Sequence, residues 1–112
     1  MKKIQAFLFL FFIFSSFLSF GQGGNIKVTG KVTDQDTKQP LEFATVTILN
    51  GETPVNGGMT DAKGEFTLSV PAGTYNIKID FISFKSVLIS NKAITENTDL
   101  GTTVLSADAT LL

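Results

Sequence analysis

Apolar and polar residues alternate with a period of two over most of the chain after residue 25. Such alternation is typical of β-strands that bury one face. It predicts strands over 26–33, 44–48, 55–60, 66–70, 75–81, 87–89 and 100–104, separated by segments rich in Gly, Pro, Asp and Asn. No window shows a sustained helical period, and Thr, Val and Ile dominate the strands. Short strands with turn signals at roughly 8–12-residue spacing predict an all-β, seven-stranded β-sandwich.

The segment 55–60 is the weakest of these strands because it contains Gly57 and Gly58. Glycine offers no side chain to pack, and inside a strand it often marks a bulge or a close approach of another backbone. We therefore expect 55–60 to lie at a sheet edge or to contain a bulge.

The N-terminal residues have a different composition, since seven of the eleven Phe fall within the first twenty positions. Two lysines precede a long apolar run, and small residues stand just before Gln22. This layout predicts a secretory signal peptide over 1–21, so the chain is expected to be exported. An uncleaved anchor is disfavoured because a spanning helix needs about 20 apolar residues, and this run is shorter and interrupted. The expected domain then covers 22–106, and 107–112 would begin a truncated C-terminal continuation.

The composition excludes most of the side-chain combinations on which catalytic and metal-binding sites depend. The chain has no Cys, His or Trp, and all nine basic residues are Lys. Without His and Cys, most nucleophile–base pairs and the common zinc and copper sites are excluded. Without Arg there is no bidentate clamp for phosphate, and a net charge of −1 gives no sign of a nucleic-acid partner. We expect a domain that is not an enzyme, needs no cofactor or metal, and is held by its apolar core without disulfides.

The segment TDAKGEF, residues 60–66, gathers two carboxylates and a lysine around one glycine. The Asp61 side chain can accept hydrogen bonds from backbone N–H groups just ahead of it, and Gly64 can take a positive φ without steric cost. A catalytic acid/base pair would also need a cleft and a third group, and the sequence indicates neither. We expect Asp61 and Gly64 to form a structural hairpin turn, and Gly73, after Pro71, to permit the next reversal.

A second acidic cluster, Asp34 and Asp36 with Lys38, has the spacing that begins a calcium-binding loop. An EF-hand loop would need a further oxygen ligand in place of Lys38, a Gly in place of Gln39, and a distal Glu. The match fails at these three positions, so we expect a solvated loop and no metal site.

The stretch IDFISFKSVLIS departs from simple alternation. Phe81 continues the core-facing set, which places Ile82 and Phe84 on the opposite face, although a sandwich strand buries only one face. Either a bulge near Ser83 turns Phe84 inward, which we favour, or an exposed apolar patch meets a partner. We hypothesise that Ile82 and Leu88 contribute to a protein-contact surface, because both lie opposite the core-facing residues.

Four short motifs occur in a characteristic order along the chain. They comprise Gly30, Val32 and Asp34, then Pro40, Leu41, Ala44 and Val46, then Thr60, Asp61, Gly64 and Phe66, and finally Pro71, Gly73 and Tyr75. In this order they resemble the carboxypeptidase-regulatory-like, or transthyretin-like, domain found at the N-terminus of SusC-type TonB-dependent outer-membrane receptors. Phe84 stands at the family's aromatic position, whereas Ser83 replaces the usual Gly.

The resemblance implies a transthyretin-like/Ig-like β-sandwich that acts as a non-catalytic accessory domain in the periplasm, associated with the outer membrane. Its partners would be the plug or barrel of a transport receptor, or another periplasmic or cell-envelope protein. Two situations stay open at this point: a fragment of a longer receptor, and a free-standing secreted or periplasmic domain that binds, for instance, carbohydrate. Sugar sites usually offer an exposed aromatic platform, and most aromatic residues after the signal peptide alternate inward.

Overall fold

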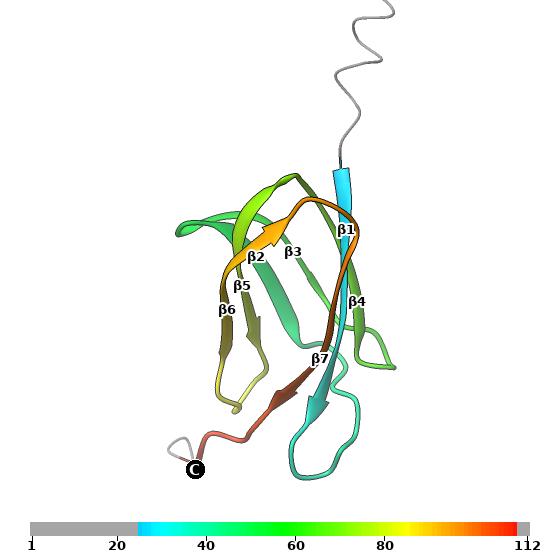
Figure 1. Ribbon diagram of the computed structural model, residues 1–112. Coiled ribbons are helices and arrows are strands. Elements are labelled where there is room, and N and C mark those ends of the chain that lie inside the picture. The colour runs from blue at the N-terminus through cyan, green and yellow to red at the C-terminus, as the bar shows by residue number, and fades with distance from the viewer. Residues whose placement is uncertain (1–24, 110–112) are drawn as a thin grey trace, which may run out of the picture.

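The computed structural model describes residues 25–109, which form a sandwich of two β-sheets (Figure 1). This part of the chain contains seven strands and no α-helix. The strands are β1 (Asn25–Asp34), β2 (Thr45–Asn50), β3 (Thr53–Met59), β4 (Glu65–Pro71), β5 (Gly73–Asp80), β6 (Val87–Ile94) and β7 (Thr98–Leu105). The predicted all-β, seven-stranded sandwich is therefore confirmed.

One sheet has the strand order β4-β1-β7 and the other has the order β3-β2-β5-β6. All pairs are antiparallel except β1 with β7, which run parallel. β1 and β7 lie side by side in Figure 1, although they come from the two ends of the described chain. The last strand therefore forms one edge of the three-stranded sheet, beside the first strand at its centre.

The alternation of the sequence is visible in the burial of each central strand. In β4, Phe66, Leu68 and Val70 are buried and the residues between them are exposed. The same pattern runs through β1, β2 and β5, and the inward side chains of both sheets form one apolar core. Full burial of one such aliphatic side chain contributes roughly 1.5–3 kcal/mol, which is the main stabilising term in a chain without cysteine.

The weak third strand is an edge and adjoins a bulge, as its glycines predicted. β3 is one of the two outer strands of the four-stranded sheet, and its register with β2 shifts between Ile48 and Leu49. Its neighbour across the sandwich corner is β4, where the Asn56 amide donates to the Ser69 carbonyl at 2.7 Å. The second residue of β3 is Pro54, which has no N–H to offer to a further strand.

The edge strands on the other side of the sandwich also contain irregularities. In β7, the register with β1 shifts near Gly101, which has φ 73°. In β6, the register with β5 shifts near Asn91, which has φ 54° and donates its N–H to the Asn76 side chain. Such bulges twist an edge and interrupt the row of groups to which another strand could pair.

The chain turns sharply after β5, where the sequence suggested a bulge within a longer strand. β5 ends at Asp80, and residues 81–84 form a tight turn in which the Phe84 N–H donates to the Phe81 carbonyl at 3.0 Å. Ser83 has φ 66°, the left-handed conformation that glycine adopts most easily. Phe84 does turn inward and packs edge-to-face on Phe81, with ring centroids 5.3 Å apart, but a turn rather than a bulge redirects it.

Beyond β7 the chain stays attached to this same turn. The Lys85 N–H donates to the Ser106 carbonyl, and the Asp108 N–H donates to the Ser83 carbonyl, both at 2.9 Å. The described chain therefore leaves the sandwich beside the β5–β6 turn, opposite the end where β1 begins (Figure 1). The predicted signal peptide lies outside the described residues. Among residues 25–109, no helix has the length and apolarity to cross a membrane.

Candidate functional site

The TDAKGEF loop uses its conspicuous acid to organise its own backbone. One Asp61 carboxylate oxygen accepts the N–H groups of Lys63 and Glu65, each at 2.9 Å. The Gly64 N–H donates to the Asp61 carbonyl at 2.9 Å, and Gly64 has φ 74°. The Gly64 carbonyl in turn accepts the Val32 N–H at 2.8 Å, which attaches the loop to β1. These contacts give Asp61 and Gly64 structural roles in the loop.

Gly73 was expected to permit a chain reversal after Pro71, but it does so without a positive φ. Its φ lies outside the left-handed region, and β5 already begins at this residue. A Cβ added to Gly73 would lie 3.1 Å from the Tyr75 hydroxyl oxygen. That hydroxyl donates to the Pro71 carbonyl at 2.7 Å and so ties β5 back to the end of β4. Gly73 therefore leaves room for the Tyr75 ring rather than supplying a positive φ.

The acidic loop after β1 is also occupied by its own backbone. A carboxylate oxygen of Asp34 accepts the N–H of Asp36 at 2.8 Å and that of Thr37 at 3.4 Å. Within residues 25–109, no three acidic side chains gather as they would around a metal ion. Among the described residues, therefore, none join Asp34 and Asp36 in a cluster that could hold a metal ion.

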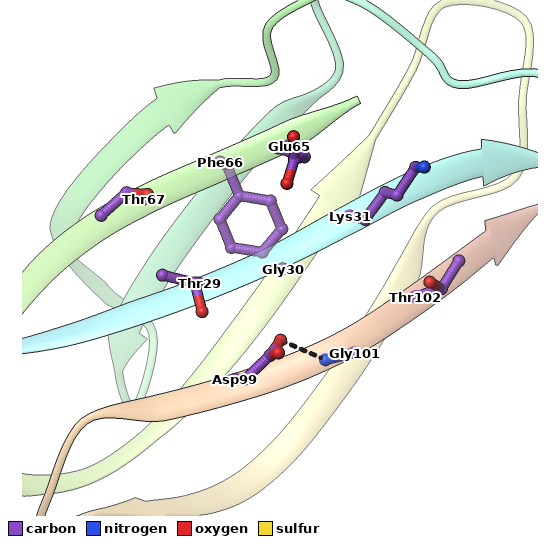
Figure 2. A pocket seen from close by; sticks show the side chains of 9 residues that line it. All are labelled: Thr29, Gly30, Lys31, Glu65, Phe66, Thr67, Asp99, Gly101 and Thr102. Atoms are coloured by element: carbon purple, nitrogen blue, oxygen red, sulfur yellow. Dashed lines mark hydrogen bonds between the residues drawn. The ribbon is translucent and has the colours of Figure 1, made fainter. Parts of the chain in front are cut away.

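A polar depression of about 380 Å³ lies on the three-stranded sheet (Figure 2). Its side chains are those of Thr29, Lys31, Glu65, Thr67, Asp99 and Thr102. The Asp99 carboxylate accepts the Gly101 N–H at 2.8 Å and therefore stabilises the β7 bulge. Figure 2 shows the Phe66 ring beside Gly30 of β1. A Cβ added to Gly30 would lie 2.5 Å from this ring, so only glycine fits here without a shift. This depression lacks a nucleophile–base pair, so we find no catalytic arrangement in it.

A second depression, of about 460 Å³, lies at the end of the four-stranded sheet where β2 begins and β5 ends. Its lining is mostly apolar and comprises Glu42, Phe43, Thr45, Asp80, Phe81 and Ile82. Phe43 is 67% exposed and Ile82 is 83% exposed, whereas Phe81 packs against the core. An aromatic and a branched aliphatic side chain thus face solvent within one hollow, which makes this hollow a candidate contact site.

Thr60 holds the backbone that carries Phe43. Its side chain is 3% exposed, donates to the Leu41 carbonyl, and accepts the Ala44 N–H at 2.9 Å. Its backbone accepts the Phe43 N–H at 3.1 Å and donates to the Ala44 carbonyl at 3.0 Å. These four hydrogen bonds hold segment 41–44 in place, with Phe43 at φ 67°. The ring therefore projects outward because the backbone on both sides of it is clamped.

The structure separates the two residues that the sequence proposed for partner contact. Ile82 lies at the tip of the 81–84 turn, in the same depression as Phe43. Leu88 is 57% exposed on β6, opposite Lys78, and does not line this depression. Sequence reasoning did not select Phe43, because an aromatic residue just before a strand has no periodic signal that assigns it to a face. Its outward position depends on Thr60, which lies 17 positions further along the chain.

The fold defines a small β-sandwich module, and within its described residues no group of acidic side chains could hold a metal ion. The model of the CarboxypepD_reg-like domain family matches residues 28–112. The chain therefore belongs to the CarboxypepD_reg-like domain family. A search of curated proteins found no significant match.

Several solved structures are similar to this chain. A chain of the type II cohesin–X-dockerin complex of Acetivibrio cellulolyticus, C-terminal interface mutant, matches with a TM-score of 0.62 and 26% identity, over 73% of this chain and 58% of that one. The 5-hydroxyisourate hydrolase of Klebsiella pneumoniae matches at 0.57 and 20% identity, over 70% and 89%. The shaft pilin SpaA of Lactobacillus rhamnosus GG matches at 0.55 and 17%, over 77% and 47%.

The last two similarities, below 25% identity, establish a common fold and nothing more. This chain spans 58% of the length of the two cohesin–X-dockerin chains that it matches. The family is regulatory-like, and one structural neighbour is a hydrolase, so the sandwich fold by itself does not decide between contact and catalysis. That choice depends on the surfaces of this chain.

Proposed function

We propose that this protein is a non-catalytic accessory domain that docks onto another protein, at the front of a TonB-dependent outer-membrane receptor. The observation that carries the proposal is the apolar depression around Phe43 and Ile82. It presents exposed apolar side chains that a partner protein could cover. The family match over 28–112 supports the accessory role. A catalytic role is disfavoured because the chain has no His or Cys and its Asp61 carboxylate is engaged by backbone N–H groups.

The proposed location is the periplasm, beside the outer membrane, after export by the N-terminal signal. The partner is the receptor plug or barrel, or another envelope protein. The described chain leaves the sandwich beside the turn that carries Ile82, so a following domain would lie near the apolar depression. Ile82 and Leu88 both face solvent and remain the proposed contact residues from the sequence.

The receptor context is tested by reading the coding DNA beyond codon 112. An open frame that continues into a plug and barrel supports the receptor, and a stop codon followed by unrelated genes contradicts it. Fractionation of the cells of origin adds a separate measurement, in which the protein is expected with the periplasmic and outer-membrane fractions. Recovery in the cytoplasm with an intact N-terminus would contradict export.

The contact role is tested by replacing Ile82 and Leu88 together with Lys. Both side chains are exposed, so circular dichroism and thermal unfolding are expected to match the wild type. Co-purification with a receptor partner, or cross-linking to it in cells, is expected to fall. An unfolded double variant would place these residues in the core, and undiminished assembly would remove them from the interface.

A second candidate function is a free-standing domain that binds carbohydrate. The exposed Phe43 ring beside the Glu42 and Asp80 carboxylates favours it, since sugars stack on aromatic faces and donate hydroxyl hydrogen bonds. A glycan array probed with the wild type and with Phe43→Ala tests this alternative. Oligosaccharide binding that disappears in the variant would favour the free-standing domain.

A further inference from the structure

Phe43 combines an unfavourable backbone with an exposed side chain. A bulky residue at positive φ is a conformational outlier, and Gly or Asn would occupy φ 67° more easily. The ring is 67% exposed, so it gains little from burial in the sandwich. The Thr60 hydrogen bonds keep this backbone in place. Residues held in such conformations cluster at binding sites, which makes Phe43 the strongest binding candidate on this surface.

The depression next to Phe43 has an apolar interior and an acidic rim. Phe43, Phe81 and Ile82 supply the apolar surface, and Glu42 and Asp80 supply the two carboxylates. No lysine of the described chain lines it, and neither carboxylate forms an ion pair there. The Asp80 carboxylate accepts a hydrogen bond from the Ser86 hydroxyl, which leaves its negative charge uncompensated. The complement of this surface is an apolar group with a cation beside it.

Two other modes of association fit less well. Strand addition requires a regular open edge, and β3, β6 and β7 have bulges at or near their pairing, while a side chain of β3 already donates to β4. A two-fold contact between copies of this chain would bring Glu42 and Asp80 of one copy toward those of the other. After removal of the predicted leader the chain has seven lysines and ten Asp and Glu side chains. Two copies would therefore both carry net negative charge, which further disfavours their association.

We propose that this depression binds a segment of another protein that presents an apolar side chain next to an arginine or lysine. The apolar side chain lies between Phe43 and Ile82, and the cation pairs with Glu42 and Asp80. Arginine fits best because its guanidinium stacks on an aromatic face while it bonds to carboxylates. The proposal rests on the accessory, partner-docking function and specifies the partner's chemistry. A sugar fits less well, because the apolar surface of Phe81 and Ile82 leaves its hydroxyls without hydrogen bonds.

The test is selection from a phage-displayed library of random 12-residue peptides on the full chain as purified after export. Selected peptides are expected to place Arg or Lys next to an apolar residue. A synthetic peptide of the leading sequence, labelled with fluorescein, is expected to bind with a micromolar Kd in fluorescence anisotropy. Binding should weaken at least ~10-fold between 50 and 500 mM NaCl if the cation pairs with the rim, because salt screens exposed charges.

Phe43→Asn is the main variant, because asparagine tolerates the left-handed backbone. It is expected to weaken the peptide at least ~10-fold, as loss of a central aromatic anchor does. Its thermal midpoint should not fall by more than about 2 °C, because relief of the backbone offsets the lost packing. Glu42→Gln should reduce the salt dependence while leaving the fold intact. Val104→Lys, on the other sheet, is the matched control and should bind within twofold of the wild type.

Several results would overturn the proposal. These are a selection without enrichment, enriched peptides that lack a basic residue, and peptide binding that Phe43→Asn leaves unchanged. A large drop in the thermal midpoint of Phe43→Asn would show that the ring is structural. Phe43-dependent binding to a glycan array, or a dimer in sedimentation that Phe43→Asn dissolves, would assign the depression to a sugar or to a second copy. The receptor context can fail separately, since the reading frame beyond codon 112 decides it without any binding measurement.

Discussion

Gly64 offers a quantitative test of how the TDAKGEF loop is built. It has φ 74°, and an added Cβ would lie 2.5 Å from the Val32 carbonyl oxygen and 3.0 Å from the Pro40 Cβ. Gly64→Ala therefore introduces two separate penalties, one from the backbone conformation and one from a collision with β1. Real Cβ atoms do not approach a backbone oxygen so closely, so the loop must move away from β1.

The two penalties have different sizes. Placing alanine in the left-handed region destabilises by about 1 kcal/mol. Moving the loop stretches the Val32 N–H to Gly64 carbonyl bond, now 2.8 Å, and disturbs the Leu41 N–H to Val32 carbonyl bond, now 3.0 Å. Each of these bonds contributes about 0.5–1.5 kcal/mol. The total is about 2–4 kcal/mol of unfolding free energy, a large share of the roughly 5–15 kcal/mol typical of a domain.

Gly51→Ala is the matched control, because Gly51 has φ 64° and nothing within 4 Å of an added Cβ. It carries the conformational penalty alone, so its free energy of unfolding should fall by only about 1 kcal/mol. Urea unfolding followed by circular dichroism measures both variants. With a slope near 1 kcal/mol per molar, the midpoint should fall by about 1 M for Gly51→Ala and about 2–4 M for Gly64→Ala. Equal shifts would refute the collision with β1, and no shift for Gly51→Ala would refute the conformational term.

Substitutions at three further positions test other contacts by the same unfolding measurement. Thr60→Val leaves the buried Leu41 carbonyl and Ala44 N–H without partners and should cost about 1–3 kcal/mol, whereas Thr60→Ser keeps the hydroxyl and should cost much less. Asp61→Ala removes the acceptor of two backbone N–H groups and should cost about 1–2 kcal/mol, while Asp61→Asn, which keeps an oxygen, should stay closer to the wild type. Ser83→Gly should stabilise by about 0.5–1 kcal/mol, because glycine accepts φ 66° without strain; a loss of stability would show that the Ser83 side chain contributes to the turn.

The strands of this protein could be predicted from the sequence because a strand exposes its two faces alternately. Phe66, Leu68 and Val70 lie two positions apart, and all three are buried. The reversal at Gly64 was also predictable, since the Asp61 contacts that shape it span only a few residues. The inward position of Phe84 was foreseen, but a turn was mistaken for a bulge, because period-two alternation does not distinguish the two.

Only the tertiary structure decided which strands pair and which apolar residues stay outside. The parallel contact between β1 and β7 joins the two ends of the described chain, and no local pattern encodes it. Phe43 projects into solvent because Thr60 bonds to Leu41 and Ala44, which lie 19 and 16 positions earlier. Local sequence determines the period and the turns through steric and hydrogen-bond rules that act over a few residues. The position of Phe43 depends on contacts that exist only after distant strands have come together.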